Sequence, residues 1–219
     1  FLSIFFNSRQ NEHHLFFLRF EKKKYFFSST PETLFKIKGD IITVDSIAGT
    51  RASSNNKTLD KQLEKELLTN KKELKEHRYV SDFLNMELNN ICDSLKQRTR
   101  EKILKLKNVQ HIHSIFEGKL KLKNNFSASL KCLHPTPAVA GHPQKNSIKA
   151  ISKVEDYDRG LYAGACGYFM NEQSEYVVGI RSFLRDLQDI HVYAGAGLID
   201  DSIANKEWEE ISVKMKNFS

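Results

Sequence analysis

The order of strand-like and helix-like segments constrains the fold of this chain more than any other feature. Strand-like runs come first, at residues 15–20 and 24–28, and a hairpin is predicted where Gly39-Asp40 separates two β-rich runs. Strand-like runs return at residues 109–120, 165–170, 176–184 and 190–194. Strands and helices do not alternate in the βαβ manner. We therefore predict an α+β fold of mostly antiparallel sheets flanked by helices.

Helical patterns occupy the middle and the end of the chain. From Thr58 to about Lys105 the apolar residues fall near one stripe, which predicts a long helical region. Further helices are predicted from Ser147 to Val154 and from about Asn205. Proline removes backbone donors and restricts its predecessor, which predicts an irregular loop. That loop is marked by Pro135, Pro137, Gly141 and Pro143. No linker or repeat is visible, so residues 1–219 are interpreted as one domain.

Charge and cysteine content narrow the functional classes. Lys and Arg number 34 against 27 Asp and Glu, a net charge of +7. The basic runs lack the aromatic interleaving of a single-strand binder, so they are interpreted as solvated faces and nucleic-acid binding is not favoured. Three cysteines without CxxC spacing favour a reducing, cytoplasmic setting. No apolar run reaches membrane-spanning length, and the strand-like opening FLSIFF is too short and lacks the basic leader of a signal peptide.

Two acidic pairs stand far apart in the chain. Glu73 and Glu76 lie in KKELKEH, and Glu207 and Glu210 lie in KEWEEISVK. Residues three apart share a helix face, so two such helices packed together would bring four carboxylates to one point. Hard oxygen donors without clustered Cys or His favour Mg2+. For either pair alone, a solvated helix surface is the competing interpretation.

For two basic residues, Arg181 and Lys214, the sequence leaves open whether the side chain pairs with a carboxylate of the protein or binds a ligand. Arg181, in VVGIRS, is predicted on an apolar strand, where a charge is rarely buried unpaired. It meets either an internal carboxylate or the carboxylate of a ligand, for which its planar fork is suited. Lys214 follows Glu210 by four residues, and so either pairs with that glutamate or binds substrate.

Weaker signals come from a turn, a strand and a glycine-containing segment. Glu32 follows Pro31 in SSTPETLF, and a carboxyl held in such a turn beside a cleft can act as a general acid. Helix capping is the alternative, although β-rich residues follow it. His111 and His113 share one face if they lie on a strand. For these histidines a structural role is the favoured interpretation. The segment YAGAGLIDDS, residues 193–202, is either a tight turn or a turn that presents N–H groups to an anion.

Nine segments, in order, resemble those of the chorismate-utilising enzymes, and most closely those of isochorismate synthases. They are SSTPETLF, SIAGTRA, KKELKEH, HIHSIFEG, LHPTPAVAGHP, EDYDRGLYAG, YVVGIRS, VYAGAGLIDDS and KEWEEISVK. The resemblance covers nearly the whole chain from about residue 25. It implies the chorismate-binding enzyme fold, chorismate as the small-molecule substrate, and a Mg2+-dependent isomerisation. In that reaction water adds at C2 of chorismate as the C4 hydroxyl leaves.

The resemblance also implies a role for each matching residue. Glu32 matches the general acid that protonates the departing hydroxyl. Glu76 and Glu210 match the direct metal ligands, with Glu73 and Glu207 as partners that act through water. The positions that receive substrate carboxylates are matched by Tyr162, Arg181, Lys214 and the amides around Gly195 and Gly197. The same pocket is lined by Gly49 and Thr50, with His111 near the reacting ring.

Two local features select among the relatives. Aminodeoxychorismate synthases carry a lysine nucleophile just before the Gly-Thr pair, and here that position is Ala48, which cannot form a covalent adduct. Ala138 stands in HPTPAVAG where anthranilate and salicylate synthases typically carry threonine, although Ala140 replaces a glycine often seen in this loop. Another chorismate enzyme, or a non-catalytic chorismate-binding remnant, is the alternative.

The family's general base is a lysine on a strand well upstream of the acid, and only 31 residues precede Glu32. We therefore expect residues 1–219 to be the C-terminal portion of a chorismate-binding domain, nearly inactive alone. Neighbouring enzymes would direct isochorismate to menaquinone, a siderophore or salicylate.

Overall fold

Two antiparallel sheets form the framework of the molecule. The computed structural model describes residues 14–106, 109–123 and 125–215, so the strand predicted at Phe1 lies outside the described residues. The four-stranded sheet has the order β1 (His14–Glu21), β2 (Lys24–Thr30), β9 (Ser182–Asp186), β10 (Asp189–Tyr193). The six-stranded sheet has the order β5 (Cys92–Lys105), β6 (Val109–Leu120), β4 (Ile41–Ala52), β3 (Thr33–Lys38), β8 (Gln173–Val178), β7 (Ala165–Met170). Every neighbouring pair is antiparallel, and the predicted α+β fold is confirmed.

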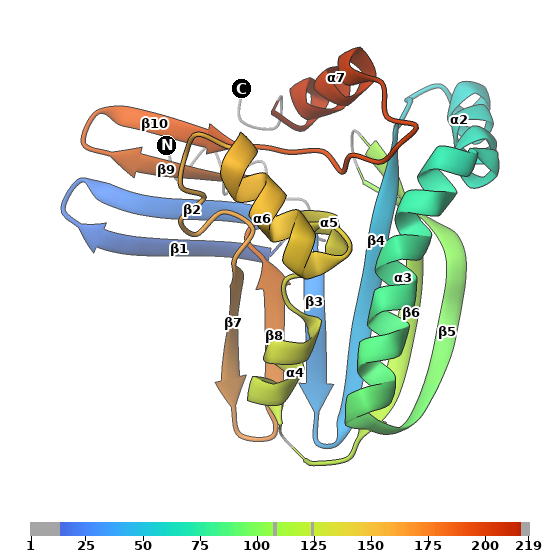
Figure 1. Cartoon of the computed structure of the whole chain (residues 1–219), viewed down its shortest axis with the longest axis vertical. Helices are drawn as coiled ribbons and strands as arrows, with labels where there is room; N and C mark the ends of the chain where they lie inside the picture. Colours follow the sequence, from blue (N-terminus) through green and yellow to red (C-terminus); the bar gives the residue numbers. More distant parts are fainter. Residues whose placement is uncertain (1–13, 107–108, 124, 216–219) are drawn as a thin grey trace.

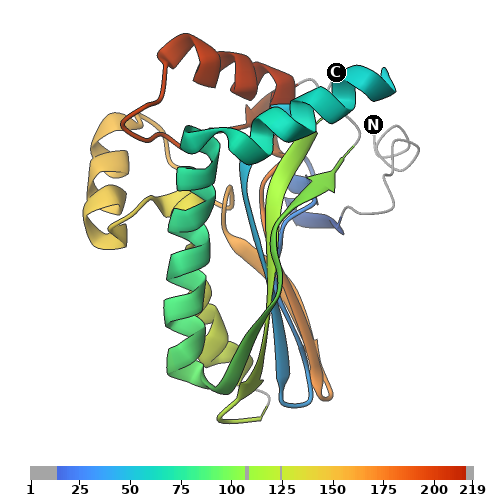
Figure 2. The same ribbon diagram turned by 90° about the vertical axis from the view of Figure 1, so that its right-hand side faces the viewer.

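The helix α3 (Lys71–Ile91) lies along one side of the six-stranded sheet, and α4 (Phe126–Leu133), α5 (Pro137–Ala140) and α6 (Gln144–Val154) lie on the same side (Figures 1 and 2). The helices α2 (Lys57–Thr69) and α7 (Ala204–Met215) lie at the upper end of this sheet in Figure 1. Asn70 caps α3 by accepting a hydrogen bond from the Glu73 amide at 3.1 Å, which fixes the first turn of that helix. In the described part of the chain, no helix is both long and apolar enough to cross a bilayer.

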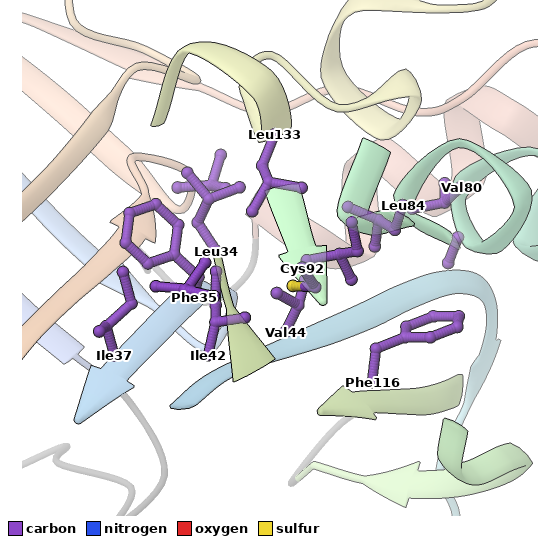
Figure 3. Close-up of a cluster of buried hydrophobic side chains, with 14 residues drawn as sticks. Leu34, Phe35, Ile37, Ile42, Val44, Val80, Leu84, Cys92, Phe116 and Leu133 are labelled. Carbon is purple, nitrogen blue, oxygen red and sulfur yellow. The ribbon is translucent and has the colours of Figure 1, made fainter. Parts of the chain in front are cut away.

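The main core lies between α3, α4 and the six-stranded sheet. Leu84 and Leu88 of α3 are fully buried against Ile42 and Val44 of β4, and Leu133 of α4 closes the cluster (Figure 3). Alternate residues of β4 point into this core, as expected for a strand with one apolar face. The packing fixes α3 along the sheet and so sets where its first turn emerges.

Two connections pass from one sheet to the other, side by side. Pro31-Glu32 joins β2 to β3, and residues 179–181 join β8 to β9. The Val178 amide donates to the Glu32 carbonyl at 3.0 Å, and the Ser29 amide donates to the Arg181 carbonyl at 3.0 Å. These bonds hold Glu32 and Arg181 at the junction between the sheets.

Two predicted elements are wrong in part. Residues 92–105 continue the predicted helix in sequence but form the edge strand β5, because they pair with β6 through matches such as Leu95 with Gly118 and Ile103 with Ile112. The predicted strand 176–184 ends at Val178, and the chain changes sheets there. The helix α4 and the short helix α5 fall where no helix was predicted.

Candidate active site

A cleft of about 190 Å3 opens at the junction of the two sheets. Both inter-sheet connections contribute to its wall, together with β4, β6, α3, α7 and the segment after β10. Nine residues with predicted roles line it: Glu32, Thr50, Glu76, His111, Tyr162, Arg181, Gly195, Gly197 and Lys214. An adjoining cleft that shares Thr50 is lined by Glu73, Glu207 and Glu210. Segments far apart in the sequence therefore meet at one place.

Glu32 is held in the inter-sheet connection with its carboxyl in the cleft. Its amide donates to the Thr30 hydroxyl at 3.1 Å, and a strand rather than a helix follows, so helix capping is excluded. Burial raises the pKa of Glu32 to about 7, even though the charges of Lys214 and Arg181 act in the opposite direction. A large share of this carboxyl is therefore protonated at neutral pH and can donate a proton.

Arg181 presents a buried guanidinium to the same cleft. The residue is 8% exposed, and within the described ranges no carboxylate lies at ion-pair distance from it. Burial lowers the pKa of Arg181, while Glu32 and Glu210 act to raise it. Its backbone φ of 51° is unusual for a residue with a side chain and costs about 1–2 kcal/mol. Of the two alternatives left by the sequence, the geometry favours an external carboxylate.

His111 enters the cleft from β6 as a neutral imidazole. Its Nδ1 lies 3.1 Å from the Thr50 hydroxyl. Burial, followed by the charges of Arg181 and Lys214, lowers the pKa of His111 to about 3. The ring can hydrogen-bond a ligand but does not carry charge at neutral pH. His113, on the same strand, instead lies 2.6 Å from Asp45.

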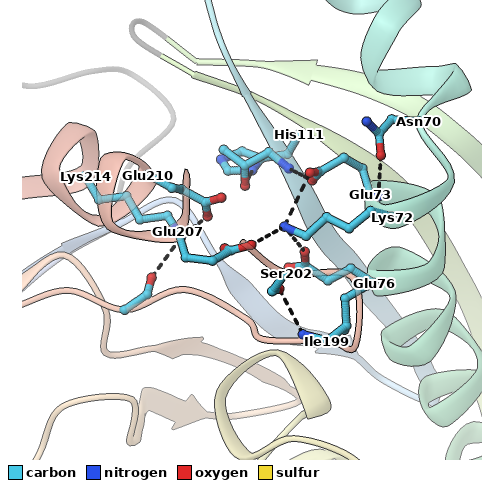
Figure 4. Close-up of polar contacts among 12 residues, drawn as sticks. Asn70, Lys72, Glu73, Glu76, His111, Ile199, Ser202, Glu207, Glu210 and Lys214 are labelled. Atoms are coloured by element: carbon cyan, nitrogen blue, oxygen red, sulfur yellow. Dashed lines mark hydrogen bonds and ion pairs between the residues drawn. The ribbon is translucent and has the colours of Figure 1, made fainter. Parts of the chain in front are cut away.

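The two glutamate pairs face each other between α3 and α7 (Figure 4). The Lys72 ammonium lies among them, 2.8 Å from Glu207, 3.5 Å from Glu73 and 3.9 Å from Glu76. Burial, followed by the charges of Glu210 and Glu73, raises the pKa of Glu76 to about 7. The protonated form of Glu76 is therefore favoured mainly by burial, and the negative charges beside it act in the same direction.

The fit of a divalent cation can be judged from these donors. Within the described ranges, no group of three or more His, Cys, Asp or Glu side chains is arranged to hold a metal ion as it stands. The ammonium of Lys72, itself a cation, nevertheless sits among three carboxylates. Carboxylate oxygens are the donors that Mg2+ prefers. The carboxylate chemistry of the cluster therefore fits Mg2+.

Lys214 has partners of its own in the cleft. Its ammonium lies 2.7 Å from Glu210, four residues earlier on α7, and donates to the Gly195 carbonyl at 2.9 Å. The pairing with Glu210 that the sequence left open is therefore present. It leaves the ammonium lining the cleft, where it ties α7 to the glycine-containing segment.

Glycine at position 49 allows β4 and α3 to approach closely. A Cβ there would lie 2.9 Å from the Glu73 carbonyl oxygen, and φ is 74°. The Thr50 amide donates to the Glu73 carboxylate at 2.8 Å. Gly49 is thus behind the cleft rather than on its surface, and it sets the position of the first turn of α3.

Several cleft residues were missed by the sequence interpretation. Arg159 forms a two-point ion pair with Glu155, donates to the Val139 carbonyl at 2.7 Å, and lies over the Tyr162 ring. It thereby joins the proline-rich loop to the Tyr162 side of the cleft. The Tyr162 ring also stacks on Tyr193, with centroids 5.3 Å apart. Lys72 was missed as well, although its place next to Glu73 and four residues before Glu76 was a visible signal.

One aromatic residue marks the outer side of α7. Trp208 follows Glu207, is 67% exposed, and is the only tryptophan of the chain. Glu207 itself is buried and turned toward α3.

Comparisons with known proteins agree on one family. A family model described as chorismate binding enzyme matches residues 5–219. Isochorismate synthase 2 of Arabidopsis thaliana is 36% identical over 196 residues, which cover 89% of this chain and 35% of the relative. Anthranilate synthase component 1 of Saccharolobus solfataricus is 32% identical over 220 residues, which cover 98% of this chain and 52% of the relative.

The fold comparison gives the same result. The structure of MenF, the menaquinone-specific isochorismate synthase from Escherichia coli, matches with a TM-score of 0.87 and 28% identity. The match covers 96% of this chain and 50% of that one. The chain thus spans between about a third and a half of the length of these relatives.

Proposed function

This chain belongs to the chorismate-binding enzyme family, and on that premise we propose that it serves as an isochorismate synthase. The reaction is the isomerisation of chorismate by addition of water at C2 and loss of the hydroxyl at C4. A carbon–oxygen bond forms at C2 and another breaks at C4, so no oxidant or reductant is needed. The free cysteines Cys92, Cys132 and Cys166 suit a reducing compartment such as the cytoplasm.

The observation that carries this proposal is that the carboxyl of Glu32, whose pKa burial raises to about 7, and the guanidinium of Arg181 line the same cleft. A hydroxyl is a poor leaving group unless it receives a proton, and a carboxyl with a pKa of about 7 can supply one at neutral pH. After the transfer Glu32 becomes a carboxylate, which the charges of Lys214 and Arg181 stabilise. The attacking water would give its proton to the family's general-base lysine, for which the sequence offers no match, and Glu32 would give its proton to the leaving hydroxyl.

The remaining cleft residues would orient the substrate. Arg181 can form two parallel hydrogen bonds to a carboxylate, and Lys214 adds a second cation on the same side. Burial raises the pKa of Tyr162 to about 12, so its hydroxyl stays a donor. Neutral His111 offers a hydrogen bond near the ring without adding charge.

Magnesium would be held by Glu76 and Glu210, with Glu73 and Glu207 as partners through water. When bound, Mg2+ would neutralise the ring carboxylate of chorismate. Glu76 lines the substrate cleft and Glu210 lines the adjoining one, so they face the boundary between the two. Replacement of Glu76 by Gln is expected to abolish Mg2+-dependent chorismate binding in calorimetry, whereas Glu66→Gln, on the exposed side of α2, leaves it intact.

Ala48 favours water over an enzyme nucleophile. It lies in the wall of the cleft, directly before Gly49 and Thr50, and its methyl group cannot attack the substrate. The second candidate is an amino-transferring synthase, favoured by the similarity to the Saccharolobus anthranilate synthase component.

Product analysis separates the two candidates. Because residues 1–219 alone are expected to be nearly inactive, a longer chain that also supplies the family's general-base lysine is incubated with chorismate and Mg2+, with and without ammonium, and the products are separated by chromatography. Isochorismate without pyruvate, unaffected by ammonium, is expected. Anthranilate or aminodeoxychorismate formed only with ammonium would overturn the proposal in favour of the second candidate. Glu32→Gln serves as the control that links any product to this cleft.

A further inference from the structure

Lys72 occupies a position that the proposed reaction does not explain. It lies in the first turn of α3, and its ammonium reaches across to Glu207 of α7 at 2.8 Å (Figure 4). The same ammonium lies 3.5 Å from Glu73 and 3.9 Å from Glu76. It therefore contacts carboxylates of both glutamate pairs.

The contacts are shielded from water. The side chain of Lys72 is 18% exposed, and those of Glu73, Glu76 and Glu207 are 8%, 19% and 7% exposed. Carboxylates so close together and so poorly hydrated repel one another and need a nearby positive charge. Glu210 already has Lys214 at 2.7 Å. Lys72 lies within ion-pair distance of each of the other three, and the charge of Lys214 also acts on Glu76.

We propose that Lys72 is a built-in cation that keeps the glutamate cluster and the contact between α3 and α7 assembled without metal, so that Mg2+ binds against its charge. Lys72 stabilises the metal-free state more than the Mg2+-bound state, because two cations in one cluster repel each other. By thermodynamic linkage, a residue that favours the metal-free state lowers metal affinity by the same factor. The cleft is then preassembled, and Mg2+ binding is weak enough to be reversible.

The test compares three proteins: wild type, Lys72→Gln and Lys75→Gln. Lys75 is a matched control because it lies on the same helix but pairs with Asp200, whose side chain is 94% exposed. Mg2+ alone is titrated by calorimetry, and the melting temperature is measured in EDTA and in Mg2+. In Lys72→Gln we expect Mg2+ to bind at least about tenfold more tightly. We also expect the melting temperature in EDTA to fall by about 3 °C or more and to recover with Mg2+. Lys75→Gln should match wild type.

Every other outcome has a defined meaning. Mg2+ affinity that is unchanged, weakened or absent in Lys72→Gln overturns the inference, as does an unchanged melting temperature in EDTA. If Lys72→Gln does not fold in EDTA, refolding that requires Mg2+ supports the inference, and an unfolded chain in Mg2+ overturns it. Lys72→Arg, which keeps the charge, should restore wild-type behaviour.

The inference rests on the proposed function only in the choice of Mg2+ as the cation. No chorismate is present in the titration, so the two can fail separately. A protein that makes no isochorismate but shows the tighter Mg2+ binding of Lys72→Gln would contradict the proposed function alone.

Discussion

The backbone amide of Val178 donates a hydrogen bond to the carbonyl of Glu32 at 3.0 Å. This bond joins the two places at which the chain leaves one sheet for the other. Glu32 stands in the first connection, and Arg181 stands in the second. The backbone of the two connections therefore positions the carboxyl and the guanidinium that the proposed reaction needs. Substitutions of either side chain should change activity or substrate binding without preventing folding.

Glu32→Gln should remove catalysis while keeping the substrate site. The amide has nearly the shape of a carboxyl but cannot give up a proton in the same way. We expect kcat to fall by roughly 10²–10⁴-fold with little change in KM. Wild-type activity should also decline above pH about 7, as Glu32 loses its proton. Steady-state kinetics over pH 5–9, with the longer chain that supplies the general-base lysine, measure both, and a fully active Glu32→Gln variant would remove the general-acid assignment.

The pH dependence of stability should reveal the same carboxyl. The folded-state pKa of Glu32, about 7, lies above its ordinary 4.5, so folding retains a proton that the unfolded chain releases. Its contribution is complete below pH about 4.5 and is lost as pH rises through 7. Relative to wild type, Glu32→Gln should gain about 3 kcal/mol between pH 4.5 and 7.5. Urea unfolding of both proteins measures the difference between their free energies of unfolding. Wild type alone is not sufficient, because His77 and His111, which are neutral in the folded state, lower the stability of both proteins in acid.

Arg181→Gly should bind substrate poorly without loss of stability. The guanidinium can form two charge-assisted bonds to a carboxylate, and their loss should weaken chorismate binding more than about 100-fold. Glycine accepts the φ of 51° without strain, so the free energy of unfolding should stay level or rise by up to about 1 kcal/mol. Calorimetry measures the loss of chorismate binding, and urea unfolding measures the free energy of unfolding. A destabilisation above about 1 kcal/mol would show that Arg181 is structural.

Gly49→Ala should damage the site through the backbone. A Cβ at this position would meet the Glu73 carbonyl at 2.9 Å, in addition to the strain of a φ of 74°. Gly39, with a φ of 64° and nothing within 4 Å of its Cβ position, provides the matched control. We expect Gly49→Ala to cost about 2 kcal/mol more than Gly39→Ala in urea unfolding. Equal losses would mean that the close approach of α3 is unimportant.

Secondary structure was predicted correctly where the local sequence pattern and the tertiary contacts favour the same element. The hairpin at Gly39-Asp40 is confirmed, since turn residues there separate two strands with clear patterns. Residues 92–105 were predicted wrongly because the pairing of β5 with β6 overrides a charged, helix-like sequence. The break before Arg181 could not be predicted, because its cause is a change of sheet rather than a turn motif.

The candidate site was predictable as a set of residue types but not as a set of contacts. The spacing of Glu73 and Glu76 places both on one face of a helix, and the structure turns that face toward α7. The ammonium of Lys72 among the carboxylates depends on the distance between two helices, which no local pattern contains.

The exposed indole of Trp208 gives the molecule an internal optical signal. It is the sole tryptophan and stands directly after Glu207, which binds Lys72 across the cluster. Any rearrangement of α7 that accompanies cation or substrate binding would change the surroundings of this one fluorophore. Emission from the unmodified chain can therefore be followed to detect such a rearrangement, without a label and without turnover.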